Sequence, residues 1–547
     1  FKYVNFDSYC VVEPSKKFYD VAVKEAKNDK IECVNDFFGI DTVLPHNTFD
    51  CIICSGLLHE VDSPEKILKG IYRYCNEDTI IHVNVPNAKS IHRLLGKAMG
   101  LIKDEHELSE KGILFQQNRV FDMNSLKKLV KQEGFEIVNK PENADIIVIN
   151  TCGFIESAKE EAINTILEMA EYKKDKCKFL IAMGCLVERY RDELAKEIPE
   201  VDLWIKYSEY DSLWDKVKKM LENEEIEETE NPSNREFLNL MDRVLTTGDN
   251  YAYLKIADGC SNRCTYCAIP YIRGPQMSRK MEDIIEEAKK LAEEGYHEII
   301  LTAQDTTKYA VDIYGKPRLA ELIEELSKIE EIKWIRFLYA YPETISDELI
   351  QVVKNNDKVC KYFDIPIQHI SDSVLKRMNR QSNGESIRKL IKKLRKEIPE
   401  VIIRTTVMVG FPGESEADFE ELYEFLQEAK FDKLGCFAYS KEDGTPASRL
   451  KEQIHPMTKK SRLNKVMSLQ QKISKQNLKN KIGKEVEVLV EDKSFDGKTY
   501  IGRSYMDVPE IDGVVYIESD DEIQIGSFVK CIITDVKEYD LIAEKIG

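Results

Sequence analysis

Apolar residues along the chain form short runs, separated by longer stretches in which they recur at helical spacing. Within residues 1–140 such runs end at Val12 and extend over Phe49–Cys54 and Ile80–Val85. Two further runs follow at Ile146–Asn150 and Phe179–Met183. Short apolar runs between helical stretches are typical of buried parallel strands. The pattern therefore predicts a doubly wound α/β layer in residues 1–140 and a second, Rossmann-like α/β segment after it.

From about residue 251 to residue 446 the alternation of strands and helices becomes regular. Six units are too few for a full eight-stranded barrel, so we expect an open, partial (β/α)6 barrel of the TIM type. In such folds the chemistry lies on loops that follow the carboxyl ends of the strands. The predicted strands are Ala252–Ala257, Glu298–Thr302, Trp334–Tyr339, Tyr362–Ile365, Val401–Val409 and Leu434–Tyr439.

The remaining segments set the domain boundaries. The stretch Glu222–Asn234 is mostly charged and polar, which predicts a linker. Residues 451–480 form a basic helical connector. Short alternating strands with Gly, Pro and Asp turns then predict a small β-barrel at the end of the chain. The predicted domains are residues 1–140, 141–235, 246–450, 451–480 and 481–547.

Composition and charge narrow the function classes. The 547 residues include 79 Lys or Arg and 98 Asp or Glu, a formal net charge of −19. This balance argues against broad, nonspecific nucleic-acid binding, which depends on basic side chains that neutralise phosphates, and it suits a basic protein partner. No apolar run reaches the roughly 20 residues of a membrane span, and the first residues lack a signal peptide. We therefore expect a cytoplasmic protein without a membrane partner. In that compartment the 14 cysteines predict metal ligands and buried thiols rather than disulfides.

Three cysteines stand close together directly after the first strand of the predicted barrel. Cys260, Cys264 and Cys267 have the spacing C-x3-C-x2-C. Three thiolates on one loop can hold three irons of a 4Fe–4S cluster and leave the fourth iron open to a substrate or cofactor. The alternatives are a zinc site and coincidence. Structural zinc takes four ligands, commonly as spaced pairs, and no His or fourth Cys lies near, so the spacing favours the cluster.

Polar residues and glycines follow the later strands of the predicted barrel. Because the carboxyl ends of these strands share one face, such residues together predict a common pocket. Any one of them can equally serve a turn or a cap. His369 is either a ligand contact or a satisfied core residue, and Gly410 and Gly413 most simply permit a tight turn. The residues at these strand ends include Gln304, Asp305, Gln368, His369, Gly410 and Gly413.

A second pair of cysteines follows two earlier apolar runs. Cys152 comes after Ile146–Asn150, and Cys185 comes after Phe179–Met183. If the two strands are parallel neighbours, both thiols lie at the same edge of the sheet. The alternative is two unrelated, half-buried cysteines.

The cysteine triad, with Tyr266 immediately before the third cysteine, resembles that of the radical S-adenosylmethionine (SAM) superfamily. The resemblance implies that SAM binds the open iron through its amino and carboxylate groups. One electron then cleaves SAM to a 5′-deoxyadenosyl radical, which removes a hydrogen from substrate. The predicted cofactor contacts are Tyr266, Gln304, Asp305, Gln368, His369, Arg404, Gly410 and Gly413.

Several longer motifs resemble the methylthiotransferase branch of that superfamily, over residues 143–547. They are Asn150-Thr-Cys-Gly-Phe-Ile-Glu-Ser-Ala-Lys159, Ala303-Gln-Asp-Thr-Thr-Lys-Tyr309, Tyr339-Ala-Tyr-Pro-Glu343, Asp364-Ile-Pro-Ile-Gln-His369, Tyr439-Ser-Lys-Glu-Asp-Gly-Thr-Pro446 and Asp507-Val-Pro-Glu-Ile-Asp-Gly513. The resemblance implies a second, auxiliary 4Fe–4S cluster held by three cysteines, of which Cys152 and Cys185 are two, and a C-terminal TRAM barrel. It also implies a second SAM as methyl donor and an electron donor such as a flavodoxin or ferredoxin.

The resemblance is greatest to methylthiotransferases that modify an aspartate of the small-subunit ribosomal protein S-twelve. The alternative is a tRNA adenosine methylthiotransferase. Charge favours the protein substrate, because residues 481–547 hold eight Lys or Arg against sixteen Asp or Glu, whereas an RNA-binding barrel needs a basic surface.

Two departures from the family leave other outcomes open. The segment with the family's first auxiliary cysteine is absent, and Cys177 lies eight residues before Cys185, too far along one strand to replace it. Unless Cys10, Cys51, Cys54 or Cys75 supplies a ligand, the chain is inactive or only cleaves SAM. In place of that segment, residues 1–140 resemble a truncated class I SAM-dependent methyltransferase, with Glu13 at the ribose position. The chain is then either a fusion, which could be bifunctional, or two joined reading frames.

Overall fold

The computed structural model describes residues 141–222, 224–226, 250–494, 498–519 and 521–546, together with Leu44, Val138 and four short strands before them. These strands are β1 (Tyr9–Val12), β2 (Ile31–Val34), β3 (Cys51–Ser55) and β4 (Ile80–Asn84). They form two parallel pairs, β1 with β2 and β3 with β4. Strands at the three predicted runs are thereby confirmed. Glu13, Cys75 and most of the predicted linker lie outside the described residues.

The chain divides into two compact units, one of residues 1–97 and 101–112, the other of residues 98–100 and 113–547. The described part of the second unit begins with a three-stranded parallel sheet in the order β5-β6-β7. Its apolar core includes Ile166, Leu180 and Val187, each at most 1% exposed. The sheet and its helices are β5 (Ile146–Thr151), α5 (Glu156–Ala170), β6 (Phe179–Gly184), α6 (Cys185–Glu197), β7 (Leu203–Lys206) and α7 (Leu213–Leu221), with 3-10 turns at Pro141–Asn143, Glu171–Lys174 and Tyr207–Ser212.

Six parallel strands form the central domain and follow one another in chain order. They are β8 (Tyr251–Lys255), β11 (Glu298–Thr302), β12 (Trp334–Phe337), β13 (Tyr362–Gln368), β14 (Ile402–Val409) and β15 (Lys433–Ala438). β8, β11 and β12 form one sheet and β13, β14 and β15 another. A parallel bridge between Ile335 and Val359 joins β12 to the segment before β13. The predicted open six-stranded barrel is confirmed.

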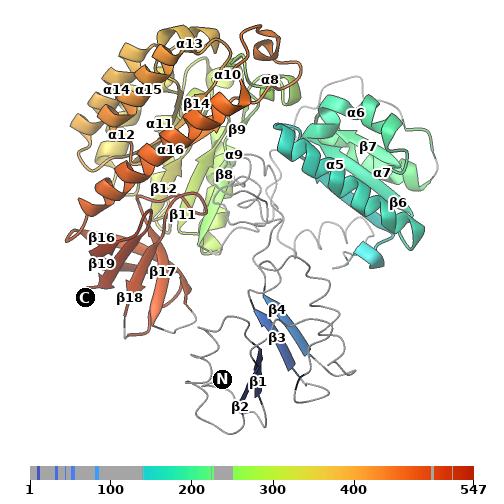
Figure 1. The fold of residues 1–547 in the computed structure, drawn as a ribbon, viewed down its shortest axis with the longest axis horizontal. Helices are drawn as coiled ribbons and strands as arrows, with labels where there is room; N and C mark the ends of the chain where they lie inside the picture. The colour runs from blue at the N-terminus through green and yellow to red at the C-terminus, as the bar shows by residue number, and fades with distance from the viewer. Residues whose placement is uncertain are drawn as a thin grey trace. The chain divides into compact units, whose positions relative to one another are not determined.

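The helices of this domain lie outside its strands (Figure 1). Three of them begin with a side-chain cap: Ser346, Asn383 and Ser415 each accept a hydrogen bond from the third backbone N–H of the helix. The helices are α8 (Ile269–Ile272), α9 (Met281–Glu293), α10 (Val311–Tyr314), α11 (Leu319–Ser327), α12 (Asp347–Asn355), α13 (Asp372–Arg377), α14 (Gly384–Glu397) and α15 (Glu416–Ala429), with 3-10 turns at Thr306–Lys308, Pro342–Thr344 and Pro446–Arg449. A short antiparallel pair, β9 (Ala257–Asp258) with β10 (Met277–Ser278), was not predicted.

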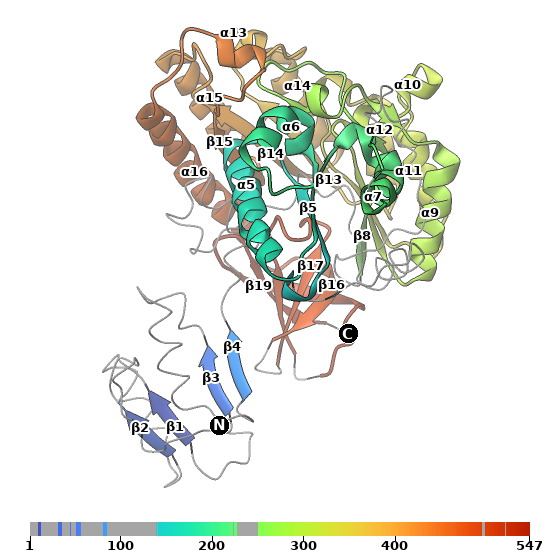
Figure 2. The same ribbon diagram turned by 90° about the vertical axis from the view of Figure 1, so that its right-hand side faces the viewer.

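The predicted basic connector is the helix α16 (Pro456–Lys479). It runs along the central domain toward the C-terminal barrel (Figures 1 and 2). That barrel is closed in the order β16-β17-β18-β20-β19, which confirms the predicted small β-barrel. Its strands are β16 (Glu485–Lys493), β17 (Thr499–Ser504), β18 (Val515–Glu518), β19 (Phe528–Val536) and β20 (Leu541–Lys545). Within the described residues, no helix is long and apolar enough to span a membrane.

The C-terminal barrel packs against the amino ends of the central strands. Tyr251, Trp334 and Tyr362 share one apolar core with barrel residues such as Val488 and Ile517. Ion pairs cross the same contact: Glu298 at the start of β11 binds Arg336 at 2.9 Å and Arg503 of β17 at 2.8 Å. Burial alone would raise the pKa of Glu298, but Arg503 and Arg336 outweigh it and hold that pKa below its ordinary value. The amino end of the central domain is therefore closed, and the carboxyl end is left for chemistry.

Candidate metal centre

The three predicted cluster cysteines lie together on the loop between β9 and α8. Cys260 and Cys264 are buried, and Cys267 is half-buried. A left-handed residue, Arg263 with a φ of 38°, turns the loop back on itself, and the Cys267 N–H donates to the Cys264 carbonyl at 3.1 Å. Burial, together with the nearby Cys264 thiol, raises the pKa of Cys260 to about 11 and that of Cys267 further. Three thiolates there need the positive charge of a metal to be stable.

Asp305, at the carboxyl end of β11, holds the cysteine loop in place. Its carboxylate accepts from the Asn262 side chain at 2.7 Å and from the Thr307 hydroxyl at 2.5 Å. Lys308 binds the other side of the Asn262 amide. The Asn262 backbone N–H in turn points at the Cys260 sulfur, 3.5 Å away. Asp305 was predicted as a cofactor contact; its observed bonds are those of a residue that positions the cysteine loop.

A second segment fastens the other side of the loop. Thr265 donates its backbone N–H to the Met378 carbonyl at 3.0 Å and its hydroxyl to the Arg377 carbonyl at 2.8 Å. The Asn379 amide donates to the Arg263 carbonyl at 3.0 Å. The cysteine loop is therefore held by two segments that are far apart in sequence, one that follows β11 and one at the end of α13.

Arg380, which follows this segment, is a site residue that the sequence did not single out. Only 7% of Arg380 is exposed, and its guanidinium lies 4.1 Å from the centre of the Tyr341 ring. The Tyr341 hydroxyl is 3.5 Å from the Cys264 sulfur. Arg380 pairs with Glu343 at 3.4 Å and donates to the Pro366 carbonyl at 3.1 Å, but its Nη1 finds no hydrogen-bond partner among the described residues. A buried cation with an unused donor near the Cys264 thiol can bind an anionic ligand.

Tyr266 and Gln304 are the other two predicted contacts beside the cysteine loop. Burial raises the pKa of Tyr266 well above its ordinary value, with the Cys264 thiol acting in the same direction, so the phenol stays protonated. The Gln304 side-chain oxygen is buried and, within the described part of the chain, has no donor.

Among the described residues no group of three or more His, Cys, Asp or Glu converges on a single ion. Thiolates that each bind a different iron of a cubane do not need to converge in this way, so the loop fits a 4Fe–4S cluster.

The other predicted contacts have structural partners. Burial lowers the pKa of His369 to about 3, and its neutral Nδ1 accepts from the Ser371 N–H at 3.0 Å. Its Nε2 is buried and has no hydrogen-bond partner among the described residues. The Arg404 guanidinium binds Asp364 at 2.9 Å. Gln368 ends β13 with a φ of 67° at an irregularity of the strand. A contact of these side chains with a cofactor stays a prediction.

Gly410 and Gly413 stand in the turn after β14, with φ of 71° and 81°. A Cβ at Gly410 would lie 2.4 Å from the Lys459 side chain, and one at Gly413 would lie 1.9 Å from Arg377. The turn interpretation is therefore supported directly, because the space beside each glycine is filled by this chain.

Cys152 and Cys185 lie at the same edge of the N-terminal sheet, as the pattern predicted. β5 and β6 are parallel and pair Thr151 with Gly184, and each cysteine is the next residue. The two thiols are close enough to interact: burial first, and then Cys185 among other groups, raises the pKa of Cys152 to about 11. Cys177 precedes the opposite end of β6, where its thiol donates to the Phe179 carbonyl at 3.3 Å. It cannot join the pair, in agreement with the sequence analysis.

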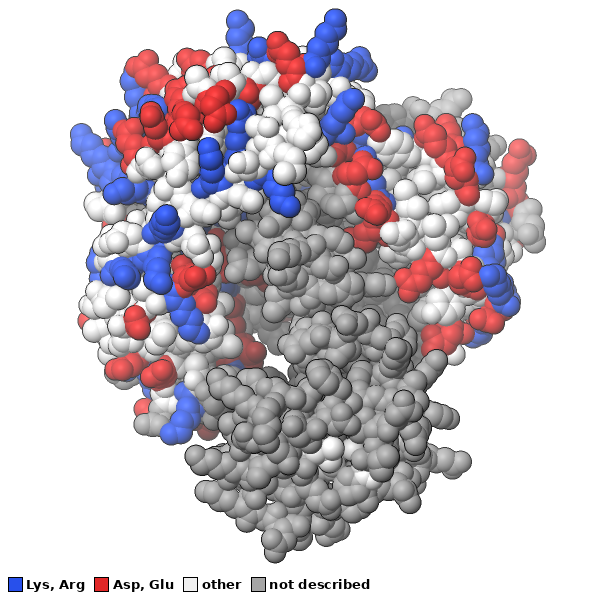
Figure 3. Space-filling model, in the orientation of Figure 1, with Lys and Arg blue, Asp and Glu red and all other residues white. Residues whose placement is uncertain are grey.

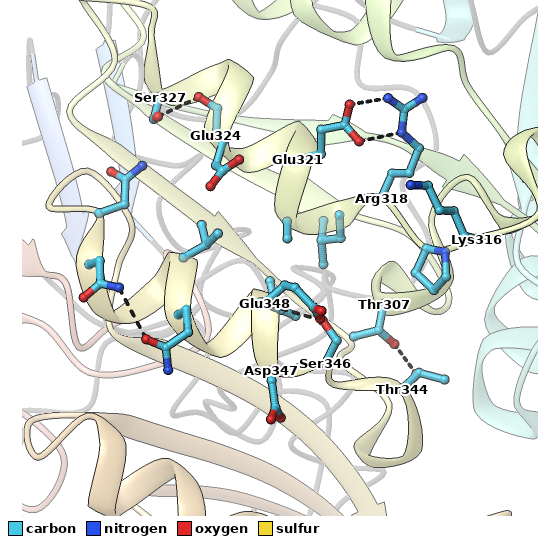
Figure 4. A pocket seen from close by; sticks show the side chains of 18 of the residues that line it. Thr307, Lys316, Arg318, Glu321, Glu324, Ser327, Thr344, Ser346, Asp347 and Glu348 are labelled. Carbon is cyan, nitrogen blue, oxygen red and sulfur yellow. Dashed lines mark hydrogen bonds and ion pairs between the residues drawn. The ribbon is translucent and has the colours of Figure 1, made fainter.

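A cavity of about 1290 Å³ lies elsewhere on the central domain. It extends from Thr307 and Thr344 along α11 and α12 to Lys358. Figure 4 shows that its labelled side chains are largely paired with one another, as Arg318 is with Glu321 and Thr307 with Thr344. None of the six cysteines discussed above lines this cavity.

Family models match successive parts of the chain. Residues 1–140 match a methyltransferase domain, 116–206 the uncharacterized protein family UPF0004, 254–426 the radical SAM superfamily and 482–546 the TRAM domain. The first two matches overlap over residues 116–140, which contain the run Gly134-Phe-Glu-Ile-Val138.

Relatives match over most of the chain. The ribosomal protein uS12 methylthiotransferase RimO from Alkaliphilus oremlandii is 62% identical over 417 residues, which cover 76% of this chain and 94% of that protein. The enzyme of the same name from Acetivibrio thermocellus is 50% identical and covers 78% of this chain and 95% of its own length. Among solved structures, the radical SAM methyltransferase TsrM from Kitasatospora setae aligns with a TM-score of 0.44 at 12% identity, over 66% of this chain and 74% of that chain.

Proposed function

The chain belongs to the family of the ribosomal protein uS12 methylthiotransferases RimO, and we propose that it transfers a methylthio group to an aspartate side chain of uS12 by radical SAM chemistry. The observation that carries the proposal is the cysteine loop. Three thiols, two buried and one half-buried, lie at the carboxyl end of the central strands, next to a buried arginine with an unused donor. The family's cofactors, 4Fe–4S clusters and SAM, are what such a loop can hold.

Each residue of the site has a definite task in this proposal. Cys260, Cys264 and Cys267 hold the first cluster. When bound, this cluster supplies one electron that cleaves SAM, and the cleavage starts the radical reaction on the substrate. Asn262 and Asp305 keep the loop in one conformation. Arg380 offers Nη1 to the negative charge of the cluster or of the SAM carboxylate, and Gln304 offers its oxygen to a donor of SAM.

Cys152 and Cys185 are proposed as ligands of an auxiliary cluster that delivers the sulfur. Their placement at one sheet edge supports this role. The described part of residues 141–547 offers no third thiol at this edge, because Cys177 precedes the opposite end of β6, where it donates to the Phe179 carbonyl. In this proposal a ligand from outside residues 141–547 completes the site. The electron donor is a flavodoxin or ferredoxin, and the reaction takes place in the cytoplasm.

A tRNA substrate remains the second candidate, although the total charge of the C-terminal barrel opposes it. One of these acidic groups is offset by a base outside the barrel, because Asp507 pairs with Lys433. On the face drawn in Figure 3, Lys and Arg side chains lie among the acidic ones over this barrel. The net charge is therefore weaker support for a basic protein partner than the sequence suggested. The high identity to the uS12 enzymes remains the main support.

The test is reconstitution of the chain with iron and sulfide without oxygen, followed by reaction with SAM and a reductant. About eight irons per chain would mean two cubane clusters, and about four would mean one. Mass spectrometry of uS12 and of tRNA after the reaction distinguishes the two substrates. A methylthio group on tRNA and none on uS12 would overturn the proposal.

The control for the cysteine loop is a pair of variants. Cys264→Ala should lose about four irons per chain and all SAM cleavage. Cys531→Ala, which removes an equally buried thiol from the C-terminal barrel, should retain both. Normal SAM cleavage in Cys264→Ala would remove the loop from the mechanism.

A further inference from the structure

The helix α16 carries a row of basic side chains on an otherwise acidic protein. Its 24 residues, Pro456–Lys479, include seven Lys or Arg and no Asp or Glu, whereas the whole chain has a formal net charge of −19. Six of its exposed residues follow one another at intervals of four and three, so they lie in one line along the helix. They are Ser461, Lys465, Ser468, Lys472, Lys475 and Lys479.

The opposite side of the helix fixes this row in place. Leu463 and Val466 belong to the apolar core of the central domain. The Arg462 guanidinium, in a residue only 5% exposed, binds the buried Glu414 at 2.7 Å. The row therefore projects from a helix that cannot turn about its axis. On the face drawn in Figure 3, Lys and Arg side chains follow the part of the surface where Figure 1 draws α16.

The chain does not neutralise this row with its own described acids. The helix α14 is also rich in Lys and Arg, but its exposed lysines lie against carboxylates. These pairs are Lys389 with Glu385, Lys392 with Glu428 and Lys393 with Asp347. Among the described residues, none of Lys465, Lys472, Lys475 and Lys479 forms an ion pair. The charge of the row is therefore available to a partner.

The composition of the exposed face indicates the kind of partner. Between Ser461 and Lys479 the exposed residues are Lys, Ser, Asn and Gln, with no apolar or aromatic side chain among them. The buried centres of protein–protein interfaces are instead rich in aromatic residues, Met and Arg, and poor in Lys and Ser. Lys, Ser, Asn and Gln are among the side chains that bind phosphates and sugars of nucleic acids. The row therefore fits a nucleic-acid backbone better than an acidic protein.

The row begins near the face that carries the cysteine loop. The first turn of α16 lies at the carboxyl ends of the last strands, where the Lys459 ammonium donates to the Tyr439 carbonyl at 2.8 Å and its side chain fills the space beside Gly410. Lys465 lies roughly 9 Å beyond Lys459 along the helix axis, and Lys479 lies roughly 21 Å beyond Lys465. A protein substrate at the carboxyl ends of the strands therefore leaves α16 within reach of RNA attached to that substrate.

We propose that the exposed row of α16 binds RNA of the small ribosomal subunit, so that the chain takes uS12 as part of an RNA–protein particle and not as a free protein. The inference rests on the proposed function, because it takes uS12 as the substrate. Each lysine that meets a phosphate neutralises it and releases its counterion. Four lysines form a contact of limited extent, which agrees with a chain whose overall charge opposes broad binding of nucleic acids.

The helix α14 supplies a matched control, because three exposed lysines can be removed from it as well. The two variants carry Lys472→Gln, Lys475→Gln and Lys479→Gln in α16, and Lys389→Gln, Lys392→Gln and Lys393→Gln in α14. Both change the net charge by the same amount. Lys465 is kept in the first variant, because its ammonium group also lies 5.5 Å from the centre of the Phe419 ring.

The experiment measures binding of the reconstituted full chain, without SAM or reductant, to purified small ribosomal subunits and to free uS12 at several KCl concentrations. The unchanged chain should bind the subunits more tightly than free uS12, with an affinity that falls steeply with salt. The α16 variant should bind the subunits at least tenfold more weakly, and the slope of log Kd against log salt should decrease by about 2 to 3. Its affinity for free uS12 and its melting temperature should not change, and the α14 variant should match the unchanged chain.

The other outcomes are distinguishable. Equal affinities of the unchanged chain for subunits and free uS12, or equal slopes in the two variants, would overturn the inference and leave the proposed function intact. Loss of affinity for flavodoxin or ferredoxin in the α16 variant, with unchanged binding of subunits, would overturn it in favour of an acidic protein partner. A methylthio group on tRNA and none on uS12 after the reaction would overturn the proposed function, and this inference with it.

Discussion

Arg380 and His369 illustrate at the scale of single residues how burial decides what a side chain can do. Both are at least nine-tenths buried and lie on the carboxyl side of β13. Each has a side-chain nitrogen without a hydrogen-bond partner among the described residues, Nη1 of Arg380 and Nε2 of His369, while the Nδ1 of His369 accepts from the Ser371 backbone. Both nitrogens are therefore available to a ligand, but that of Arg380 belongs to a cation and that of His369 to a ring that burial keeps neutral.

Replacing Arg380 with Met should weaken SAM binding at least tenfold, because a charged hydrogen bond in a buried site contributes about 1.5–3 kcal/mol. The unbranched Met side chain keeps part of the packing against Tyr341. The measurement is the spectral change of the reconstituted cluster as SAM is added. Arg388→Met, on the outer face of α14 with its partner Glu428, is the control. An unchanged SAM affinity in Arg380→Met would mean that Nη1 serves no ligand.

His369 should make stability fall on mild acidification. Burial lowers its pKa from 6.5 to about 3 in the folded protein, so between these values the unfolded chain binds a proton that the folded chain does not. The contribution is complete above pH 6.5 and declines by at most about 1.4 kcal/mol per pH unit as the pH falls toward 3. Urea unfolding of the native chain and of His369→Gln between pH 7 and pH 4 tests this. The variant should show a flatter dependence, and equal slopes would contradict the expectation.

At the scale of elements, the junction between β6 and α6 places Cys185 at the same sheet edge as Cys152. Gly184 ends β6 with a φ of 116°, and a Cβ there would lie 2.5 Å from the Thr151 carbonyl. A Cβ built on Gly153, just after the neighbouring strand, would lie 2.6–2.7 Å from backbone atoms of Cys185 and Leu186. The two glycines allow the cysteine-bearing strand ends to lie this close.

Gly153→Ala should therefore push the two strand ends apart. Overpacking of this kind costs about 1–3 kcal/mol, and the backbone of Cys185 has no flexible end that could give way. The expected result is a lower melting temperature together with loss of iron from the second site, measured on the reconstituted protein. Gly435→Ala in β15, where a Cβ would find its nearest neighbour at an ordinary 3.7 Å, should change neither. Full iron content in Gly153→Ala would mean that the close approach is not needed for the site.

At the scale of the whole second unit, the C-terminal barrel closes the amino end of the central domain and is joined to it by buried ion pairs. Arg503 reaches from β17 to Glu298 of β11 and to Glu491 of β16, and Arg336 of β12 binds the same Glu298. All four side chains are largely or wholly removed from water. Such a network stabilises only when complete, because a charge left alone in the interior is costly.

Arg503→Met should lower the free energy of unfolding by about 3–5 kcal/mol, since it leaves the Glu298 carboxylate with one partner instead of two. The double variant Arg503→Met with Glu298→Gln should recover part of this loss, because the unpaired charge is then gone. Denaturant unfolding of both, compared with the native chain, gives the answer. If the single variant loses no more than the roughly 1 kcal/mol of a surface pair, the network does not hold the barrel in place.

The sequence by itself determined the elements and the chemistry that depend on near neighbours. Strand spacing predicted β11 to the residue and the other central strands to within a few residues, because a buried parallel strand must be apolar along its whole length. The spacing of Cys260, Cys264 and Cys267 indicated a cluster because three thiolates on one short loop suffice to define it. The register that sets Cys152 beside Cys185 followed from two adjacent parallel strands.

Only the tertiary structure decided which distant charges meet. Cys185 and Arg273 are 88 residues apart, and Glu298 and Arg503 are 205 residues apart. Arg380 reaches the cysteine loop only because the segment after α13 folds over it. No local pattern marks these arginines, since a buried arginine and a solvated one are the same letter in a sequence. Burial makes the contacts of these arginines specific, because a guanidinium removed from water can bind only the few partners that the fold brings within reach.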